Sequence, residues 1–159
     1  MNENKIQRRL RSKYHQTSKI IIENIYFFRY DWESDMFIVK NNGYIYEIEI
    51  KISVSDFKSD RKKIDKHNRL KSKSGFIPNK FFYCTPKGLL KISDIPEYAG
   101  LIEIGEMGEY NIKEAPFLHK EKLDYHKKIT DKLYNRWRNE VQNVRILQDL
   151  LNKPSIFKN

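Results

Sequence analysis

Alternation of apolar and polar residues is clearest between Tyr44 and Ser53, and it predicts a β-strand. The even positions are Tyr44, Tyr46, Ile48, Ile50 and Ile52, and the odd positions are Ile45, Glu47, Glu49, Lys51 and Ser53. Successive side chains of a strand point to opposite faces. One face is therefore expected to pack into the core, and the other carries Glu47, Glu49 and Lys51 in a row.

Around this strand, the pattern predicts a β-hairpin and several shorter strands. Asn42-Gly43 lies between the apolar run 36–39 and the alternating run, which is a strong hairpin signal. Further strands are expected at 26–32, which is rich in aromatic residues, at 81–84 and 101–104, and at 109–113 as an edge strand.

Helical spacing of apolar residues predicts three helices. Residues 3–25 form the first, with a weak point at 16–18. The second begins at Ser53 or Ser55 as N-cap, has Asp56 in its first turn, and ends near Arg69. The third spans 118–151 and ends before Pro154. Its apolar stripe consists of Ile129, Leu133, Trp137, Val141, Val144, Leu147 and Leu151.

The order of these elements predicts an α/β fold, with a central mixed sheet flanked by helices and a long C-terminal helix. We expect a basic N-terminal helical segment at 1–20, an α/β core at 21–117, a long helix at 118–152 packed on the core, and a tail at 153–159. Trp137 is expected in the core. The stripe is also long enough to bury against a second copy of the chain, so a homodimer through this helix remains an alternative.

Charge changes this picture, because the formal net charge of the 159 residues is +10. Residues 1–20 carry +5 and residues 53–73 another +5, so the rest of the chain is neutral. Two basic clusters suggest a polyanionic partner, most simply nucleic acid, although basic clusters are often only solvated faces.

Other classes of protein are excluded by composition. The single cysteine, Cys84, leaves no internal disulfide framework or zinc module and fits a reducing, cytoplasmic compartment. No apolar stretch approaches the roughly 20 residues of a membrane span, so no membrane is expected. The charged N-terminus has no apolar run after it, which argues against a signal peptide.

Candidate chemistry lies at the hairpin. Asp35 opens its first strand and Glu49 lies on its second, so the two carboxylates can face each other across antiparallel neighbours. Two carboxylates in a small space repel each other unless a cation lies between them, and Mg²⁺ suits oxygen ligands. Lys51 points to the same face. A metal-activated water could therefore attack phosphorus here, while the simpler alternative is a solvated strand face with paired charges.

A family resemblance supports the catalytic interpretation. Ser34-Asp35, the hairpin and Glu49-Ile50-Lys51 resemble the PD-(D/E)xK signature of the restriction-endonuclease-like superfamily, with serine in place of its proline. The stretch 47–62 resembles the MmcB-like DNA repair proteins within that superfamily, whose motif is Glu-x-Lys, a small polar residue, then Asp-Phe-basic-x-Asp-basic-Lys. Looser similarity lies at 80–88, 95–102 and 113–116, so the resemblance covers roughly residues 20–140.

The resemblance implies a restriction-endonuclease-like core and a metal site. Asp35, Glu49 and the backbone carbonyl of Ile50 would bind Mg²⁺ or Mn²⁺, and Lys51 would be the catalytic lysine. Glu33 and Glu47 crowd the same site and leave the choice of ligands open. Glu23, placed on the first helix, could be the additional acid of some related nucleases, although a surface charge is the more ordinary interpretation.

The basic helix after the motif strand is the expected DNA-binding surface. Its candidate residues are Lys58, Arg61, Lys62, Lys66 and His67. Lys62 and Lys66 are one turn apart, so both can face a phosphate backbone. The sequence thus predicts a Mg²⁺-dependent deoxyribonuclease acting in DNA repair, recombination or phage DNA metabolism. The alternative is a non-catalytic DNA-binding or recruitment module on the same fold, and RNA as the substrate is a weaker third option.

Overall fold

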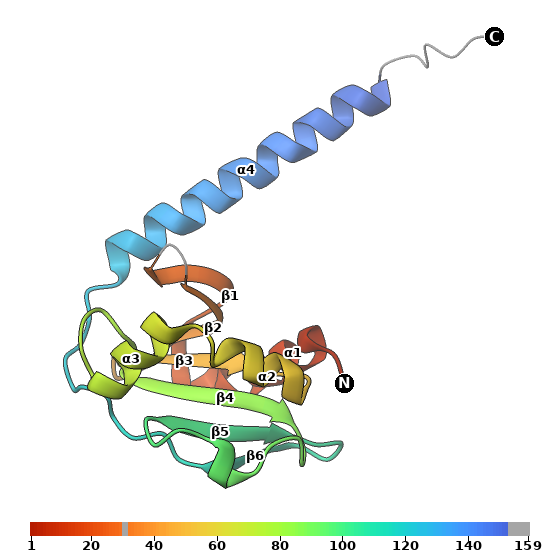
Figure 1. Ribbon diagram of the computed structural model, residues 1–159. Coiled ribbons are helices and arrows are strands. Elements are labelled where there is room, and N and C mark those ends of the chain that lie inside the picture. Colours follow the sequence, from red (N-terminus) through yellow and green to blue (C-terminus); the bar gives the residue numbers. More distant parts are fainter. Residues whose placement is uncertain (30–31, 153–159) are drawn as a thin grey trace. The chain divides into compact units, whose positions relative to one another are not determined.

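The first 123 residues form one compact unit built on a six-stranded mixed sheet. The structure is a computed structural model that describes residues 1–29 and 32–152 (Figure 1). The strands are β1 (Ser18–Arg29), β2 (Trp32–Lys40), β3 (Ile45–Ile50), β4 (Lys80–Pro86), β5 (Ala99–Ile104) and β6 (Glu109–Lys113). They follow one another across the sheet in chain order, with β3, β4 and β5 parallel and the remaining neighbours antiparallel. The predicted α/β class with a mixed sheet is confirmed.

Four α-helices accompany the sheet in the described residues. They are α1 (Glu3–Tyr14), α2 (Val54–Asp60), α3 (Ile64–Ser72) and α4 (His126–Asn152), and short 3-10 turns lie at His15–Thr17 (η1) and Ile92–Asp94 (η2). The predicted long C-terminal helix is therefore present. It begins at His126 and not at residue 118, because Leu118 is instead tied by its backbone N–H to the carbonyl of Asn79.

The helix predicted over 3–25 is wrong beyond Tyr14. The chain turns through η1, at the weak point predicted for 16–18, and then enters β1. Ile21 and Ile22 pair with Ile38 and Phe37 of β2, so sheet pairing uses apolar residues whose spacing also fitted a helix. β-branched isoleucine suits a pleated strand better than a helix.

The hairpin between β2 and β3 is confirmed. Met36 lies opposite Ile48 and Phe37 opposite Glu47 in an antiparallel register. The Lys40 N–H donates to the Tyr44 carbonyl at 2.8 Å, and Gly43 adopts a φ of +88°, which glycine reaches without steric penalty. The hairpin fixes which residues of β2 and β3 are neighbours.

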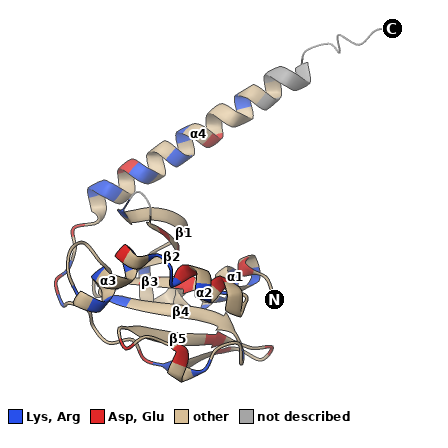
Figure 2. Ribbon diagram, in the orientation of Figure 1, with Lys and Arg blue, Asp and Glu red and all other residues tan. Residues whose placement is uncertain are grey.

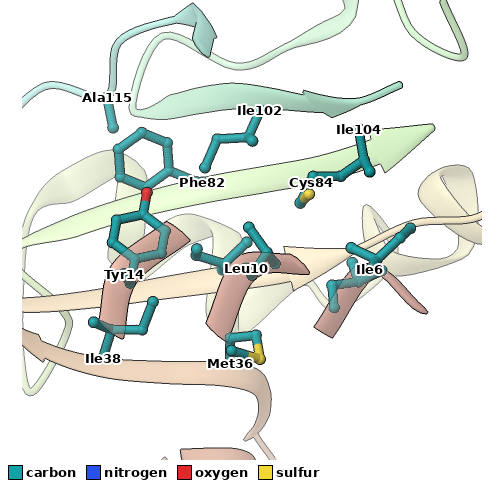
Figure 3. Close-up of a cluster of buried hydrophobic side chains, with 12 residues drawn as sticks. Ile6, Leu10, Tyr14, Met36, Ile38, Phe82, Cys84, Ile102, Ile104 and Ala115 are labelled. Atoms are coloured by element: carbon teal, nitrogen blue, oxygen red, sulfur yellow. The ribbon is translucent and has the colours of Figure 1, made fainter. Parts of the chain in front are cut away.

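One face of the sheet is an apolar core covered by α1. Ile6, Leu10 and Tyr14 of this helix pack on side chains from β2 to β5 (Figure 3). The cluster also contains Met36, Ile38, Ile48, Ile50, Phe82, Cys84, Ile102, Ile104 and Ala115. The expected apolar face of β3 is thus confirmed, and the N-terminal basic segment carries part of the core on its other side. Cys84 is buried as a small apolar residue.

The opposite face of the sheet is covered by α2 and α3. The predicted single helix is broken at Arg61–Lys63, since Lys63 has a ψ of 70° that a helix does not allow. Ser53 caps α2 by accepting a hydrogen bond from the Asp56 N–H at 3.1 Å, as expected. Phe57 is buried and its ring lies 4.9 Å from that of Tyr83 on β4. The break gives α3 its own direction over the sheet.

The helix α4 belongs to a second unit that begins at Asp124. Contrary to the expectation for Trp137, its side chain is 58% exposed, and Leu133, Tyr134 and Val144 are also exposed. Of the other stripe residues, Ile129 is buried and Val141 is half-buried. Leu147 and Leu151 have side chains outside the described part of the structure. Lys and Arg positions recur along this helix (Figure 2). No described helix is both long and apolar enough to span a membrane.

Candidate active site

The hairpin brings Asp35 and Glu49 to the same face of the sheet. Continuing the β2–β3 register beyond Met36 and Ile48 places the two residues opposite each other. Asp35 Oδ2 accepts a hydrogen bond of 2.6 Å from the Ile50 N–H, which joins the end of β3 to β2. Asp35 is partly exposed, whereas Glu49 is only 1% exposed. The sequence prediction that these two carboxylates are neighbours is therefore confirmed.

Both oxygens of the Glu49 carboxylate are held by lysines. Lys51 Nζ donates to Oε1 at 2.9 Å, and Lys66 Nζ donates to Oε2 at 2.8 Å. Lys63 Nζ lies 3.6 Å from Oε1. Lys51 and Lys66 are 5% and 4% exposed, so these are buried ion pairs. Removing either buried lysine would leave one oxygen of the buried Glu49 carboxylate without its hydrogen-bonded counter-charge.

Burial and mutual repulsion raise the pKa values of two carboxyl groups, Asp35 and Glu47. Burial raises the pKa of Asp35 to about 7, and the charge of Glu49 adds to the increase against the Ile50 hydrogen bond and Lys51. Burial likewise raises the pKa of Glu47 to about 7, although Lys66 opposes the shift. The pKa of Lys66 is raised, because the attraction of Glu49 and Glu47 outweighs burial. Perturbed groups gathered in this way are typical of functional sites, and also of buried ion networks.

Glu47 extends the cluster along β3. Its carboxylate accepts a hydrogen bond of 2.6 Å from Trp32 Nε1 and lies 3.4 Å from Lys66 Nζ. The side chain is fully buried, and its Oε2 has no hydrogen-bond partner. The predicted polar face of β3 is thus inside the protein, between the sheet and α3, and not on its surface.

Asp60 connects this cluster to a second buried network. Its carboxylate lies 3.2 Å from Lys63 Nζ and 3.8 Å from Lys51 Nζ, and it accepts a 2.9 Å hydrogen bond from the Tyr83 hydroxyl. His67 Nε2 lies 3.2 Å from Asp60 Oδ2, and His67 Nδ1 is 2.8 Å from the Tyr98 hydroxyl. Burial raises the pKa of Asp60, but the His67 contact and the charges of Lys66 and Lys51 outweigh it, so the pKa falls below its usual value.

Two of the residues expected to contact a phosphate backbone are buried instead. Lys66 is committed to Glu49 and Glu47, and His67, at 8% exposure, is committed to Asp60 and Tyr98. The expectation of a solvent-facing role is therefore wrong for both. Lys58, Arg61 and Lys62 are exposed on α2 and the α2–α3 connection, as a DNA-contacting surface requires.

The other two candidate acids have partners of their own. Glu23 lies on β1, not on a helix, and pairs with Arg11 of α1 at 2.8 Å. Glu33 lies opposite Tyr26, and a hydrogen bond between the two raises the pKa of Tyr26. Of the three additional acids considered from the sequence, Glu47 is the one in contact with the lysines of the Glu49 cluster.

Asp35 and Glu49 are the residues of this cluster that could hold a metal ion. Within residues 1–29 and 32–152, no three His, Cys, Asp or Glu side chains are gathered as a metal-binding group. Mg²⁺, however, is commonly bound through one or two carboxylates, with waters and substrate phosphates completing its octahedron. Asp35 is partly exposed, and burial and the charge of Glu49 both destabilise its ionised carboxylate. A divalent cation between the two carboxylates would relieve this destabilisation.

Sequence reasoning missed the partners that α3 and β4 supply. Lys66 was predicted to contact DNA, and neither Asp60 nor Tyr83 was among the candidate residues. In the structure Asp60 lies close to Lys63, with Lys51 and His67 also in contact. One signal was present in the sequence: Asp60, Lys63 and Lys66 recur every three residues, a spacing that brings side chains close together on a helix. In the structure the same three residues are gathered across the break between α2 and α3.

Comparisons with known proteins give information about the fold of this chain and not about its activity. No family model matches the sequence, and no curated protein matches it. A solved structure of a protein of unknown function from Silicibacter pomeroyi aligns with a TM-score of 0.61 and 16% identity, covering 99% of both chains. At this identity the likeness concerns the fold and carries no activity.

Proposed function

We propose that this protein is a metal-dependent DNA nuclease of the PD-(D/E)xK type, hydrolysing phosphodiester bonds. The observation that carries the proposal is the convergence of Asp35, Glu49 and Lys51 on one face at the ends of β2 and β3. These are the three residues to which the family resemblance assigned metal binding and catalysis. The central sheet with α1 on one face and α2–α3 on the other supports a restriction-endonuclease-like core.

Each residue has a role that its environment supports. Asp35 and Glu49, with the Ile50 carbonyl, would hold Mg²⁺ or Mn²⁺, which supplies an acidified water and a counter-charge for the phosphate. Lys51 lies 2.9 Å from Glu49 and can orient that carboxylate or stabilise charge on the phosphate. Lys66 holds the second Glu49 oxygen at 2.8 Å and supplies a buried counter-charge to it. Lys58, Arg61 and Lys62 would contact the DNA backbone.

A cleavage panel tests the proposal. Single-stranded, nicked, flapped and junction DNA would be incubated with Mg²⁺ or Mn²⁺ and with wild type, Glu49→Gln or Lys51→Ala. We expect metal-dependent cleavage by wild type, reduced by roughly 100-fold or more in both variants. The matched control is Glu103→Gln, a buried carboxylate on β5 that bonds the Gly88 N–H and should leave cleavage unchanged. Absence of cleavage on every substrate by the folded wild type overturns the proposal.

The second candidate function is a DNA-binding or recruitment module without catalysis. It is favoured by the saturation of both Glu49 oxygens by Lys51 and Lys66, which would have to be loosened for metal to bind. This function predicts salt-dependent DNA binding that EDTA and Glu49→Gln leave unchanged. The nuclease predicts that the divalent cation strengthens DNA binding and that Glu49→Gln removes this gain.

A further inference from the structure

A basic pocket lies beside the end of α3, outside the Glu49 cluster. It has a volume of about 540 Å³, within the range of small-ligand sites. Its lining consists of Arg61, Lys71, Lys73, Pro96, Glu97, Tyr98 and Pro116. Three of these side chains are cationic and one is acidic, so the lining carries a formal charge of +2. None of the candidate roles above involves Lys71, Lys73 or Tyr98.

The three cations are available to an anion. Arg61, Lys71 and Lys73 are exposed, and within the described residues none of them has an acidic partner at ion-pair distance. Lys73 is the C-cap of α3 and has a φ of +55°, a left-handed conformation in which glycine is more common than lysine. Phosphate groups are the anions that such Lys and Arg clusters bind most readily.

The remaining lining residues favour a larger ligand than inorganic phosphate. Pro96 and Pro116 supply apolar surface for a sugar or base, and Tyr98, 9% exposed, contributes the edge of its ring to the wall. Tyr98 is held in place, because its hydroxyl is 2.8 Å from His67 Nδ1 and its ring lies 6.4 Å from that of Phe81. The Glu97 carboxylate offers an acceptor for hydroxyl or amino groups. A ligand that matches this lining carries an anionic group, an apolar surface and hydrogen-bond donors. A nucleotide has all three.

A continuous set of contacts joins this pocket to the candidate active site. Tyr98 contacts His67, and His67 Nε2 lies 3.2 Å from Asp60 Oδ2. Lys63 Nζ then lies 3.2 Å from Asp60 Oδ1 and 3.6 Å from Glu49 Oε1. Arg61, which lines the pocket, directly follows Asp60 in the chain. A strand held in the pocket is therefore bound by the same helix pair that covers Glu49.

We propose that the pocket lined by Arg61, Lys71, Lys73 and Tyr98 binds one phosphate-bearing nucleotide of the nucleic-acid substrate. This subsite rests on the proposed nuclease function, since it would hold a substrate nucleotide apart from the scissile bond. Its phosphate contacts Arg61, Lys71 and Lys73, and its base or sugar packs on Tyr98 and the two prolines. The subsite anchors the strand while the exposed lysines of α2 follow the rest of the backbone.

Titration calorimetry with dAMP in EDTA tests the pocket without any cleavage. We compare wild type with the double variant Lys71→Glu/Lys73→Glu. The matched control is Lys87→Glu/Lys91→Glu, which makes the same change in net charge at two exposed lysines outside this pocket and outside the candidate active site. We expect dAMP affinity to fall at least tenfold in the pocket variant and to stay within about twofold of wild type in the control. Circular dichroism confirms that both variants are folded.

Three results would overturn the subsite: no dAMP binding by wild type, equal losses in the two double variants, or equally strong binding of inorganic phosphate. Equal losses would mean that only net charge matters, and equal phosphate binding would mean that the base and sugar are not recognised. Because these measurements contain no metal, they are independent of cleavage. Binding of dAMP by a protein that cuts no DNA would sustain the pocket and reject the nuclease.

Discussion

The two faces of β3 are equally buried but chemically opposite. On one face, Ile48 and Ile50 join the apolar cluster under α1. On the other, Glu47 and Glu49, together with Lys51 directly after the strand, are 0%, 1% and 5% exposed beneath α2 and α3. A single strand of six residues thus supports the apolar core with one set of side chains and a charged cluster with the other.

The difference shows where folding free energy is gained and where it is spent. Burial of an apolar side chain stabilises a protein by roughly 1.5–3 kcal/mol. Burial of an ion pair often contributes nothing, or destabilises the protein, relative to an apolar pair of the same shape. The charged cluster is therefore poorly explained by stability alone, and its placement beside the partly exposed Asp35 suits chemistry better.

Removal of Lys66 should have the largest effect on stability. Lys66→Met keeps the length of the side chain but leaves Glu49 and Glu47 without their shared counter-ion. We expect the free energy of unfolding to fall by about 3–5 kcal/mol at pH 8, measured by guanidinium denaturation. Lys62→Met, an exposed position on the α2–α3 connection, should change it by less than about 0.5 kcal/mol.

A double variant that also neutralises Glu49 tests whether unpaired charge causes the loss of stability in Lys66→Met. If charge is the cause, adding Glu49→Gln to Lys66→Met should recover part of the loss. A loss for Lys66→Met alone of less than about 1 kcal/mol would mean that Lys51 and Lys63 suffice to compensate both carboxylates. The contrast between the two faces of β3 would then be much weaker than the geometry indicates.

Truncation on the apolar face should have a smaller effect of different character. Leu10 of α1 is fully buried in the cluster with Ile48 and Ile50. We expect Leu10→Ala to lower the free energy of unfolding by about 2–4 kcal/mol through lost burial and a residual cavity. The loss should not depend on pH between 5 and 8. Leu133→Ala, at a 39% exposed position of α4, is the matched control and should cost under about 1 kcal/mol. A pH-dependent loss would contradict a purely apolar role.

The contrast also explains which features could be predicted from the sequence. The β2–β3 hairpin and the apolar face of β3 were predictable, because alternation and the Asn42-Gly43 turn are local signals. The strand predicted at 26–32 covers only the end of β1, and its first part, residues 18–25, was missed. Ile21, Ile22 and Ile25 fit a helical spacing, and only pairing with β2 decides between the two structures. The break at Lys63 depends likewise on how α3 packs over the sheet, which no local pattern specifies.

Some residues of the candidate site could likewise be predicted from the sequence, and others could not. Asp35, Glu49 and Lys51 lie within 17 residues on a single hairpin, so their proximity follows from strand geometry. Lys66, Asp60 and Tyr83 join them only through the packing of α2, α3 and β4. Charged residues are usually exposed, so a sequence pattern assigns Lys66 to the surface by default. Its burial follows from the position of two carboxylates that lie 17 and 19 residues earlier in the chain.

Neutralising Asp35 should have the smallest effect, and the opposite sign. Burial raises the pKa of Asp35 in the folded protein to about 7, above the ordinary aspartate pKa of 3.8, so the native state binds the proton more tightly than the unfolded state. The contribution of Asp35 to stability is then fully present below about pH 4 and is lost as the pH rises toward 7. Asp35→Asn keeps an oxygen that can accept the Ile50 hydrogen bond and removes the repulsion from Glu49. We therefore expect it to stabilise the protein by about 1–3 kcal/mol at pH 8, discounted for the partial exposure of Asp35, and by little at pH 4.

The effect of a divalent cation on stability tests whether the repulsion between Asp35 and Glu49 serves to bind a metal ion. If Asp35 and Glu49 share a metal ion, 10 mM Mg²⁺, roughly the level at which a weak millimolar site fills, should raise the melting temperature of wild type at pH 8 by mass action. Asp35→Asn should show no such increase, because one ligand charge and the repulsion that the cation relieves are both absent. Glu23→Gln, a carboxylate change at an exposed pair with Arg11, should leave the Mg²⁺ response intact. Equal responses in wild type and Asp35→Asn would place the cation elsewhere and leave the charged face of β3 as a structural network alone.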